Sequence, residues 1–340
     1  MEAMLASRAN NKLLPSLGFL LVAGGLLLLG WIAYSALNPG PAPYSYMLVK
    51  ESGAERIAKL GIEAWPNITI EKYEMRVDGI DQPIAVAHLA RRGDAAPVMI
   101  DWENRSNEPV ASLDVKFSEL AVVVKAIEKY TSKDALVLAW WDTSRQIRLL
   151  TGRETVFDAH VGGSFISPLP WQARSGPIDK YEREFWGAAP SAEDERKFQR
   201  YSDALSGDVA SGAAILRDLA GGREAYVVVH VSDLYKLALT HPDRLGVASN
   251  VFPLKGDMHG QVSFVKQWMQ DKNYTAYGLQ KLSEDQVRAY FLTDAKSGNT
   301  LLARMLPLTT SRPTELTALQ LVYQHGDYWV YRLPSASSSS

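Results

Sequence analysis

The sequence contains no cysteine among its 340 residues. Disulfides, thiolate-bound iron–sulfur clusters, thiol catalysis and haem attachment through a C-x-x-C-H motif all require cysteine. A chain of this length can bury a sufficient hydrophobic core without disulfide bonds. Any cofactor of those classes must therefore belong to a partner protein, and we assign no cofactor to this chain.

An excess of charge of one sign is also missing. Lysine and arginine together number 36 and aspartate and glutamate 38, which gives a formal net charge of −2. No basic stripe interleaved with aromatic residues is present, and a near-neutral chain exerts little long-range attraction on phosphate groups. Nucleic acid is therefore not an expected partner.

Motifs that would identify a catalytic centre are absent as well. The chain has no G-x-S-x-G nucleophile elbow, no P-loop, no dinucleotide-binding fingerprint and no H-E-x-x-H or H-x-H metal-ligand spacing. We accordingly assign no catalytic residue and no metal site. Whether the protein is an enzyme stays open, although these absences favour a non-catalytic role.

One long apolar run is present, over residues 13–36, and it is long enough for a helix to cross a membrane. Arg8 and Lys12 precede it and the next charge is Lys50, so the positive-inside rule places residues 1–12 in the cytoplasm. A single-pass anchor in the cytoplasmic membrane with a periplasmic domain follows. A cleaved signal peptide is the alternative, but the run exceeds a typical h-region and no A-x-A site follows it.

Composition and hydrophobic periodicity divide the rest of the chain. A Pro-rich linker is expected at 37–45 and a disordered Ser-rich tail at 335–340. Between them we expect one periplasmic domain, 46–334, of mixed α/β (α+β) class, with a mixed sheet and flanking helices. Its expected parts are 46–110, mainly strands; 111–245, an α/β core; and 246–334, alternating strands with one helix near 300–306.

Two short apolar runs stand out within 111–245. Residues 135–141 are continuously apolar and residues 225–231 are apolar apart from His230, which is typical of strands covered on both faces, and we expect the two strands to be parallel. Asp142 follows the first run directly. A further strand, 155–157, is expected to bring Asp158 and His160 to the same sheet edge, where open α/β folds usually bind ligands.

Two aromatic residues and an arginine adjoin Asp142. Trp140 and Trp141 either cover the end of the sheet or offer their faces to a ligand or partner. Arg145 either pairs with nearby acids on a solvated helix face or binds an anion. Asp142 itself either caps the next helix or accepts a hydrogen bond or a cation from a ligand.

The segment 162–190 is rich in glycine, proline and aromatic residues and shows no clear periodicity. It is long for an uninvolved connection, so we interpret it as a lid or a partner-binding loop that includes Trp171. The candidate ligand- or partner-binding residues are therefore Trp140, Trp141, Asp142, Arg145, Asp158, His160 and Trp171.

The order of elements around Trp140-Trp141-Asp142 resembles the extracytoplasmic domain of oligosaccharyltransferase catalytic subunits. The likeness runs to about residue 231 and includes a Thr-Val-x-Asp segment at 155–158. In that family W-W-D is followed by Tyr-Gly and contacts the hydroxyl residue of the acceptor, whereas this chain continues with Thr143-Ser144. The family's catalytic acids and metal site come from a polytopic membrane region, so the resemblance implies a related fold and not glycosyl transfer.

The whole-chain layout resembles the HaoB family of accessory proteins encoded beside hydroxylamine oxidoreductase. The resemblance rests on the single N-terminal anchor, the chain length and the block from Ala139 to Trp171. It implies a periplasmic accessory role in hydroxylamine oxidation, with the multihaem chemistry on the partner enzyme.

Two hypotheses of different classes follow. The chain is either a non-catalytic anchored accessory protein, whose segment 162–186 and Trp-Trp-Asp corner contact a multihaem oxidoreductase, or a small-ligand-binding or transferase-like protein. In the second case the ligand binds at Asp142, Asp158 and His160.

Overall fold

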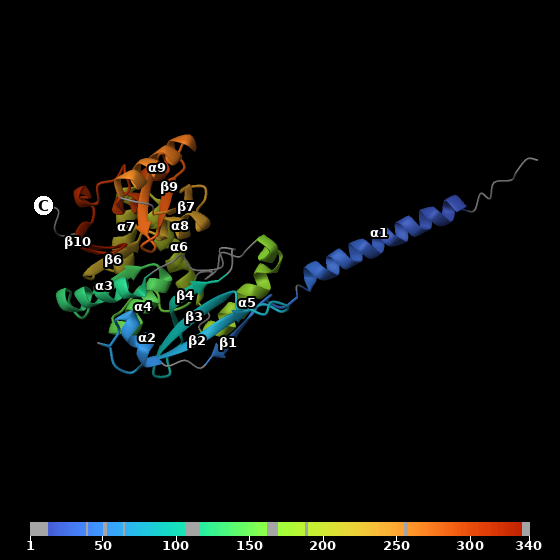
Figure 1. Ribbon diagram of the computed structural model, residues 1–340, viewed down its shortest axis with the longest axis horizontal. Helices are drawn as coiled ribbons and strands as arrows, with labels where there is room; N and C mark the ends of the chain where they lie inside the picture. The colour runs from blue at the N-terminus through green and yellow to red at the C-terminus, as the bar shows by residue number, and fades with distance from the viewer. Residues whose placement is uncertain are drawn as a thin grey trace, which may run out of the picture.

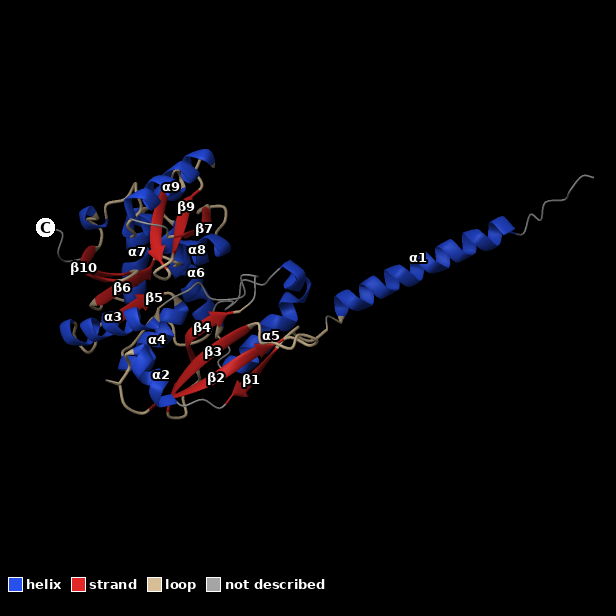
Figure 2. Cartoon of the chain, in the orientation of Figure 1, coloured by secondary structure: helices blue, strands red, loops and turns tan. Residues whose placement is uncertain are grey.

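The computed structural model describes residues 13–38, 40–49, 53–63, 65–105, 116–161, 169–187, 190–254 and 258–334. It shows a mixed α+β architecture with three separate sheets and a long N-terminal helix (Figures 1 and 2), which confirms the expected fold class. The expected tails 1–12 and 335–340 lie outside the described residues.

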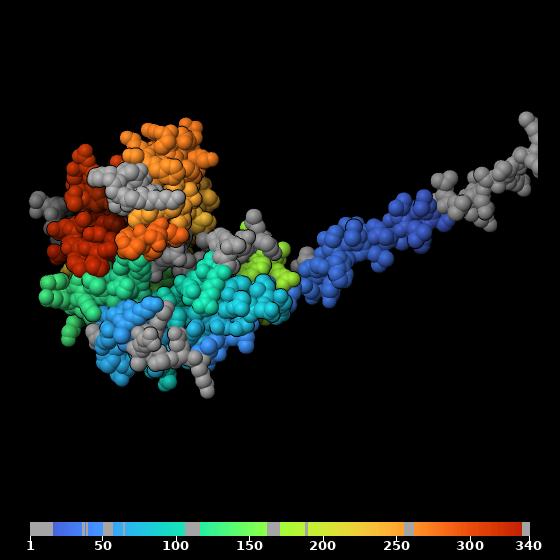
Figure 3. Space-filling model, in the orientation of Figure 1, coloured from blue at the N-terminus to red at the C-terminus, as the bar shows by residue number. Residues whose placement is uncertain are grey.

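Helix α1, Leu13–Leu37, forms from the apolar run. Its stretch Ser16–Ser35 is long and apolar enough to cross a membrane, and none of that stretch is buried against the protein. Figure 3 shows the helix standing clear of the globular part of the molecule. Length and composition of this kind fit either a membrane span or a signal sequence.

The first sheet follows α1 and is wholly antiparallel, in the order β1-β2-β3-β4. Strands β2, β3 and β4 agree with the expectation of mainly strands over residues 46–110. The short β1 was not expected as a strand. The bounds are β1 Ser45–Val49, β2 Ile68–Arg76, β3 Ala85–Arg92 and β4 Val98–Asn104.

The central sheet has the order β10-β11-β6-β5. Strands β5, Leu136–Ala139, and β6, Ala225–His230, are parallel, as expected, with Ala139 opposite Val228. Strands β10, Gln320–His325, and β11, Tyr328–Leu333, form the expected closing hairpin, and β11 pairs antiparallel with β6.

Alternate residues of β5 and β6 enter two different hydrophobic clusters. Val137 and Val228 pack with the inner faces of α3 and α4 and with the first sheet, whereas Leu138 and Val227 pack with α6, α7 and α8. Both faces of these strands are therefore covered, which explains their continuous apolar sequence. The helices are α3 Phe117–Tyr130, α4 Trp141–Thr151, α6 Ala192–Ser206, α7 Val209–Ala220, α8 Asp233–Thr240 and α10 Leu301–Met305.

The β10–β11 hairpin turns at Gly326, which has a positive φ of 54°. A Cβ atom there would lie 1.9 Å from Glu119 Oε2, so glycine is required for space as well as for conformation. The same carboxylate accepts a hydrogen bond from the backbone N–H of Asp327 at 3.0 Å. Helix α3 thereby fixes the hairpin that borders β6.

The third sheet, β7-β9-β8, is antiparallel and packs with helix α9. The expectation of alternating strands from residue 262 onward was wrong at α9, where Val262, Val265 and Met269 recur at helical spacing. Strand β7 lies within the part expected to contain strands. The bounds are β7 Val247–Pro253, α9 Met258–Asp271, β8 Ala276–Lys281 and β9 Gln286–Leu292.

The segment expected to be an irregular loop, 162–190, contains regular structure. Residues 169–174 form a 3-10 helix and Ser175–Trp186 form helix α5, which buries Ile178, Glu182 and Trp186. The expected lack of periodicity was wrong there, because those three residues recur every four positions on one helix face. Residues 162–168 lie outside the described part of the chain.

The fold has three further short elements among the described residues. They are α2 Gly53–Leu60 and the 3-10 helices Ser297–Asn299 and Pro313–Glu315.

Candidate functional site at the carboxyl edge of the central sheet

The parallel pair β5 and β6 places two polar corners at one sheet edge. Asp142 follows β5 in the first turn of α4, while Ser232 and Asp233 follow β6 at the start of α8. The expected strand at 155–157 is reduced to a single parallel bridge between Thr155 and Val137. It nevertheless carries the chain toward His160 beside the same edge.

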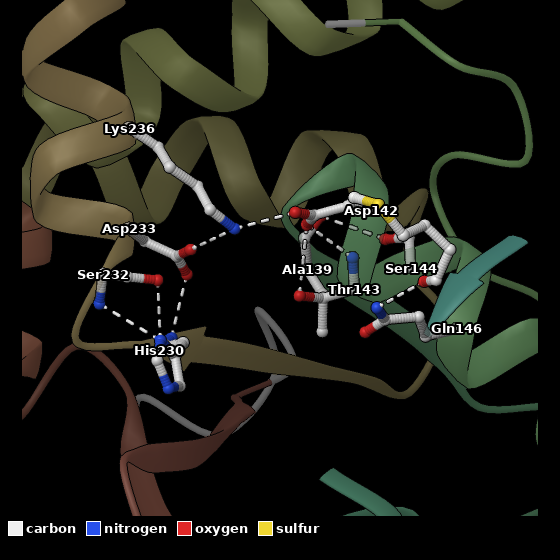
Figure 4. Close-up of polar contacts among 10 residues, drawn as sticks. Ala139, Asp142, Thr143, Ser144, Gln146, His230, Ser232, Asp233 and Lys236 are labelled. Atoms are coloured by element: carbon white, nitrogen blue, oxygen red, sulfur yellow. Dashed lines mark hydrogen bonds and ion pairs between the residues drawn. The ribbon is translucent and has the colours of Figure 1, made fainter. Parts of the chain in front are cut away.

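Asp142 and Asp233 share one ammonium group, that of Lys236 (Figure 4). Lys236 Nζ donates to Asp142 Oδ2 at 2.8 Å and lies 3.4 Å from Asp233 Oδ1. The other Asp142 oxygen accepts from the backbone N–H of Thr143 at 2.6 Å. Asp142 thus contacts both α4 and α8 through an ion pair with Lys236 and a hydrogen bond from Thr143.

Burial and charge oppose each other in this group. Burial raises the pKa of Asp233 to about 6, against the attraction of Lys236. Burial lowers the pKa of Lys236, but Asp142 and Asp233 raise it by more, so that the net shift is upward. At neutral pH the two carboxylates therefore hold a charged ammonium group, and the three form a closed ionic cluster at the edge of the sheet.

His230 ends β6 beneath this cluster. Its backbone N–H donates to Asp233 Oδ2 at 2.8 Å, and its ring Nδ1 lies 2.7 Å from Ser232 Oγ. Burial lowers the pKa of His230 well below its usual value, with Lys236 adding to the effect, so the ring is neutral. The ring Nε2 is buried and has no partner among the described residues.

His160 lies between two tryptophan rings. Its ring is 4.2 Å from that of Trp141 and stacks on Trp186 of α5 at 5.5 Å and 17°. Burial lowers the pKa of His160 to about 3, with Arg145 contributing, so the imidazole is neutral at physiological pH. Arg145 Nη1 lies 3.4 Å from Nδ1, which makes Nδ1 the acceptor and assigns the ring proton to Nε2.

A small cavity of about 20 Å³ adjoins this sandwich and is lined in part by His160, Asp142 and Met99. It has room for about one water molecule. His160 Nε2 is buried without a partner among the described residues, so a single acceptor in the cavity would satisfy it.

The other candidate residues are placed as follows. Trp140 and Trp141 are buried, at 4% and 6% exposure, and their rings contact protein groups, which agrees with the interpretation that they cover the sheet end. Asp158 is exposed and pairs with Arg148 at 3.4 Å. Trp171 stacks on Tyr44 at 5.2 Å, in a different hydrophobic cluster from Trp141.

Arg145 is buried and does not lie on a solvated helix face as one interpretation expected. Its Nη2 donates to the carbonyl of Pro97 at 2.8 Å, and no carboxylate of the described residues lies within 4 Å of its guanidinium. Burial lowers the pKa of Arg145 to about 10, which still leaves it charged at neutral pH.

Sequence reasoning missed Lys236 and Trp186. A signal for Lys236 existed, since residue 236 lies one helical turn after Asp233, and parallel strands would bring that turn beside Asp142. Trp186 gave no comparable signal, because it reaches His160 only through the packing of α5. Across the described part of the chain no group of three or more His, Asp, Glu or Cys side chains is placed to hold a metal ion.

Two solved structures resemble the chain weakly. One is the C-terminal globular domain of oligosaccharyltransferase from Archaeoglobus fulgidus, at 10% identity and a TM-score of 0.32, covering 63% of this chain and 95% of that domain. The other is the C-terminal domain of C. jejuni PglB, at 14% identity and 0.36, covering 63% and 99%.

No curated protein matches the sequence. A family model described as "HaoA-associated protein HaoB" matches residues 10–333, which include α1 and every strand and helix of the globular part. This chain belongs to the HaoB family of HaoA-associated proteins.

Proposed function

We propose that the chain is a membrane-anchored accessory protein that associates with HaoA, the multihaem hydroxylamine oxidoreductase, in the periplasm and catalyses no step itself. The observation that carries the proposal is the family match over residues 10–333, whose description names HaoA as the associated protein. The absence of cysteine supports this division of labour, because covalent haem attachment through thioethers must then occur on the partner.

The sheet edge also supports an accessory role. Asp142 and Asp233 are both paired with Lys236, and His160 is enclosed by two tryptophans and held neutral. A general acid or base works best with a pKa near the operating pH, and burial moves the pKa of His160 far below it. These contacts suit a rigid corner that shapes a docking surface.

Association with HaoA is tested by capture from native membranes. The full chain with a C-terminal affinity tag is extracted in mild detergent, and HaoA in the eluate is detected by mass spectrometry and haem absorbance. We expect HaoA to be enriched over an equally expressed single-pass protein with the same tag. Equal recovery with both baits would contradict the proposal.

The surface of α5 is the part of segment 162–186 best suited to test for partner contact. Lys180 and Arg183 are exposed on this helix, so the double variant K180E/R183E should fold. We expect it to lose capture of HaoA, because charge reversal at an interface costs several kcal/mol. The matched control reverses two exposed lysines, Lys266 on α9 and Lys272 directly after it, as K266E/K272E, and should retain capture.

The natural absence of cysteine permits a clean test of topology. Ser7→Cys and Ala295→Cys place one thiol on each side of α1, and Ala295 is exposed in a loop. We expect a membrane-impermeant maleimide to label Ala295→Cys in spheroplasts and Ser7→Cys only after lysis. Release of the labelled domain from washed membranes would instead indicate a cleaved signal sequence.

A second candidate function is the binding of a small ligand at the same edge. The observation that favours it is His160 Nε2, a buried ring nitrogen that lacks a partner among the described residues and adjoins a small cavity. Substitution of Asp142, Asp158 and His160 together should then abolish any ligand-induced rise in melting temperature. A rise that persists in the triple variant excludes this site.

A further inference from the structure

A larger cavity, of about 340 Å³, lies where α4 packs against the first sheet. Arg145 and Arg148 of α4 line it together with Arg92, the last residue of β3. Small residues of the β3–β4 turn form the remaining wall and Asp158 is also part of the lining. We propose that this arginine pocket, defined by Arg92, Arg145 and Arg148, binds a small oxyanion of the phosphate class.

The charges around the arginine pocket do not balance. Three guanidinium groups line it against a single carboxylate, Asp158, which pairs with Arg148 at 3.4 Å. Among the described residues no carboxylate lies within 4 Å of Arg92 or Arg145. The lining therefore carries two more positive charges than negative ones, with Asp142 outside it also attracting Arg145, in contrast to the exposed arginine pairs elsewhere on the surface.

Arg92 and Arg145 have N–H groups that donate to no acceptor among the described residues. Arg92 Nη2 donates to the Leu150 carbonyl at 2.6 Å, but its Nε is buried and has no acceptor among the described residues. Arg145 Nη2 donates to the Pro97 carbonyl, and Arg145 Nη1 lies 3.4 Å from His160 Nδ1, near the upper limit for a hydrogen bond. Both contacts to carbonyls hold the guanidinium groups in place without neutralising them.

Fixed guanidinium groups favour planar or tetrahedral oxyanions, because their N–H pairs match two oxygens at once. A buried charge without a counter-ion is costly, so an anion that enters the arginine pocket gains more there than at a solvated arginine. The volume suits a small molecule.

Asp158 is the internal competitor in this arrangement. Its carboxylate is exposed and holds Arg148 across the mouth of the pocket, so an incoming oxyanion must share or displace that pair. Removal of the Asp158 charge should therefore strengthen binding, whereas removal of Arg148 should weaken it. A purely structural arginine cluster would not predict opposite signs for these two exposed residues.

The test measures binding of inorganic phosphate to the full chain in detergent by isothermal titration calorimetry, at constant ionic strength set with chloride. We expect saturable binding with about one site per chain. Arg148→Gln should raise Kd about tenfold, the loss of one charge-assisted hydrogen bond. Asp158→Asn should lower Kd severalfold.

Matched controls exist elsewhere on the surface. Arg200 and Asp218 form an ion pair whose side chains are exposed to nearly the same extent as those of Arg148 and Asp158. Arg200→Gln and Asp218→Asn should leave Kd unchanged. No saturable heat, or equal effects of the Arg148 and Arg200 variants, overturns the proposal.

A second series distinguishes the chemistry of the ligand. Competition of phosphate by a small dicarboxylate such as succinate would show that the arginine pocket accepts carboxylates as well. Displacement by sulfate but not by succinate would restrict the ligand to tetrahedral oxyanions. The melting temperature of the chain is measured in parallel as phosphate is added. A rise that does not saturate, and that is equal in Arg148→Gln, would be the general effect of phosphate on protein stability and counts against a site.

Discussion

The two ends of helix α4 treat charge in opposite ways. At the first turn, Asp142 shares the ammonium group of Lys236 with Asp233, so each charged side chain of this group has an ion-pair partner within the fold. One to two turns later, Arg145 and Arg148 adjoin a cavity in which positive charge exceeds negative. Every charged side chain of the first group is ion-paired, whereas Arg145 has no carboxylate partner among the described residues. We therefore interpret the first group as structural and the second as a binding site.

Removal of Lys236 disrupts the ion-paired group at the first turn of α4 and should have the largest effect on stability. Lys236→Met leaves Asp233, which is almost fully buried, without its counter-charge. We expect the free energy of unfolding at pH 7 to fall by about 3–5 kcal/mol, measured by urea denaturation of the full chain. The matched substitution in the arginine pocket, Arg148→Met, should change it by less than about 1 kcal/mol.

The Lys236→Met penalty should also shrink under acid. Burial already raises the pKa of Asp233 to about 6, and the loss of Lys236 raises it further, so the carboxyl becomes neutral as the pH falls. A penalty that is equal at pH 7 and pH 5 would show that Lys236 contributes through packing and not through charge.

His160 lies between these two groups, and its buried, neutral ring makes the stability of the protein depend on pH. In the folded protein the pKa of His160 is about 3, whereas in the unfolded chain it is about 6.5, so only the unfolded state takes up the proton between these values. Stability is therefore lost as the pH falls below 6.5. By pH 5 this one group should cost about 2 kcal/mol relative to pH 7.

His160→Phe removes this contribution and should flatten the profile of unfolding free energy between pH 7 and pH 5 relative to the parent chain. Asp233 and Asp327, whose pKa values burial raises to about 6, act in the opposite direction but are common to both proteins. The difference between the two profiles isolates His160. Parallel profiles would contradict a buried neutral imidazole.

Substitution of Arg145 should have a smaller effect than removal of Lys236 or titration of His160, and it tests the arginine pocket. Arg145→Met loses the hydrogen bond to the Pro97 carbonyl but leaves no carboxylate stranded, in contrast to Lys236→Met. We expect a loss of about 1 kcal/mol in thermal or urea unfolding. A loss as large as that of Lys236→Met would mean that the arginine pocket is structural, against the binding role proposed for it.

The parts of the fold that sequence predicted are those whose burial leaves a local pattern. Strands β5 and β6 are covered on both faces and therefore read as continuous apolar runs, and Asp142 was placed correctly at the end of the first. Helix α9 also carried its pattern in Val262, Val265 and Met269, and was missed because alternation was extended too far.

The partners of the site residues were harder to predict, because they depend on contacts across long sequence separations. Lys236 lies 94 residues from Asp142, and the pair forms only because β5 and β6 are adjacent and parallel. Trp186 reaches His160 through α5, a helix in a segment whose glycines and prolines suggested a loop. No local pattern specifies such contacts.

The junction between α1 and the globular part has a mechanical consequence. Tyr44, immediately before β1, donates to Glu182 Oε1 at 2.6 Å, and Trp186 donates to the second oxygen of the same carboxylate, also at 2.6 Å. Trp186 in turn stacks on His160. A force applied along α1 would therefore be carried by the two buried hydrogen bonds to Glu182. These bonds connect the segment that follows α1 to the residues that pack beside α4.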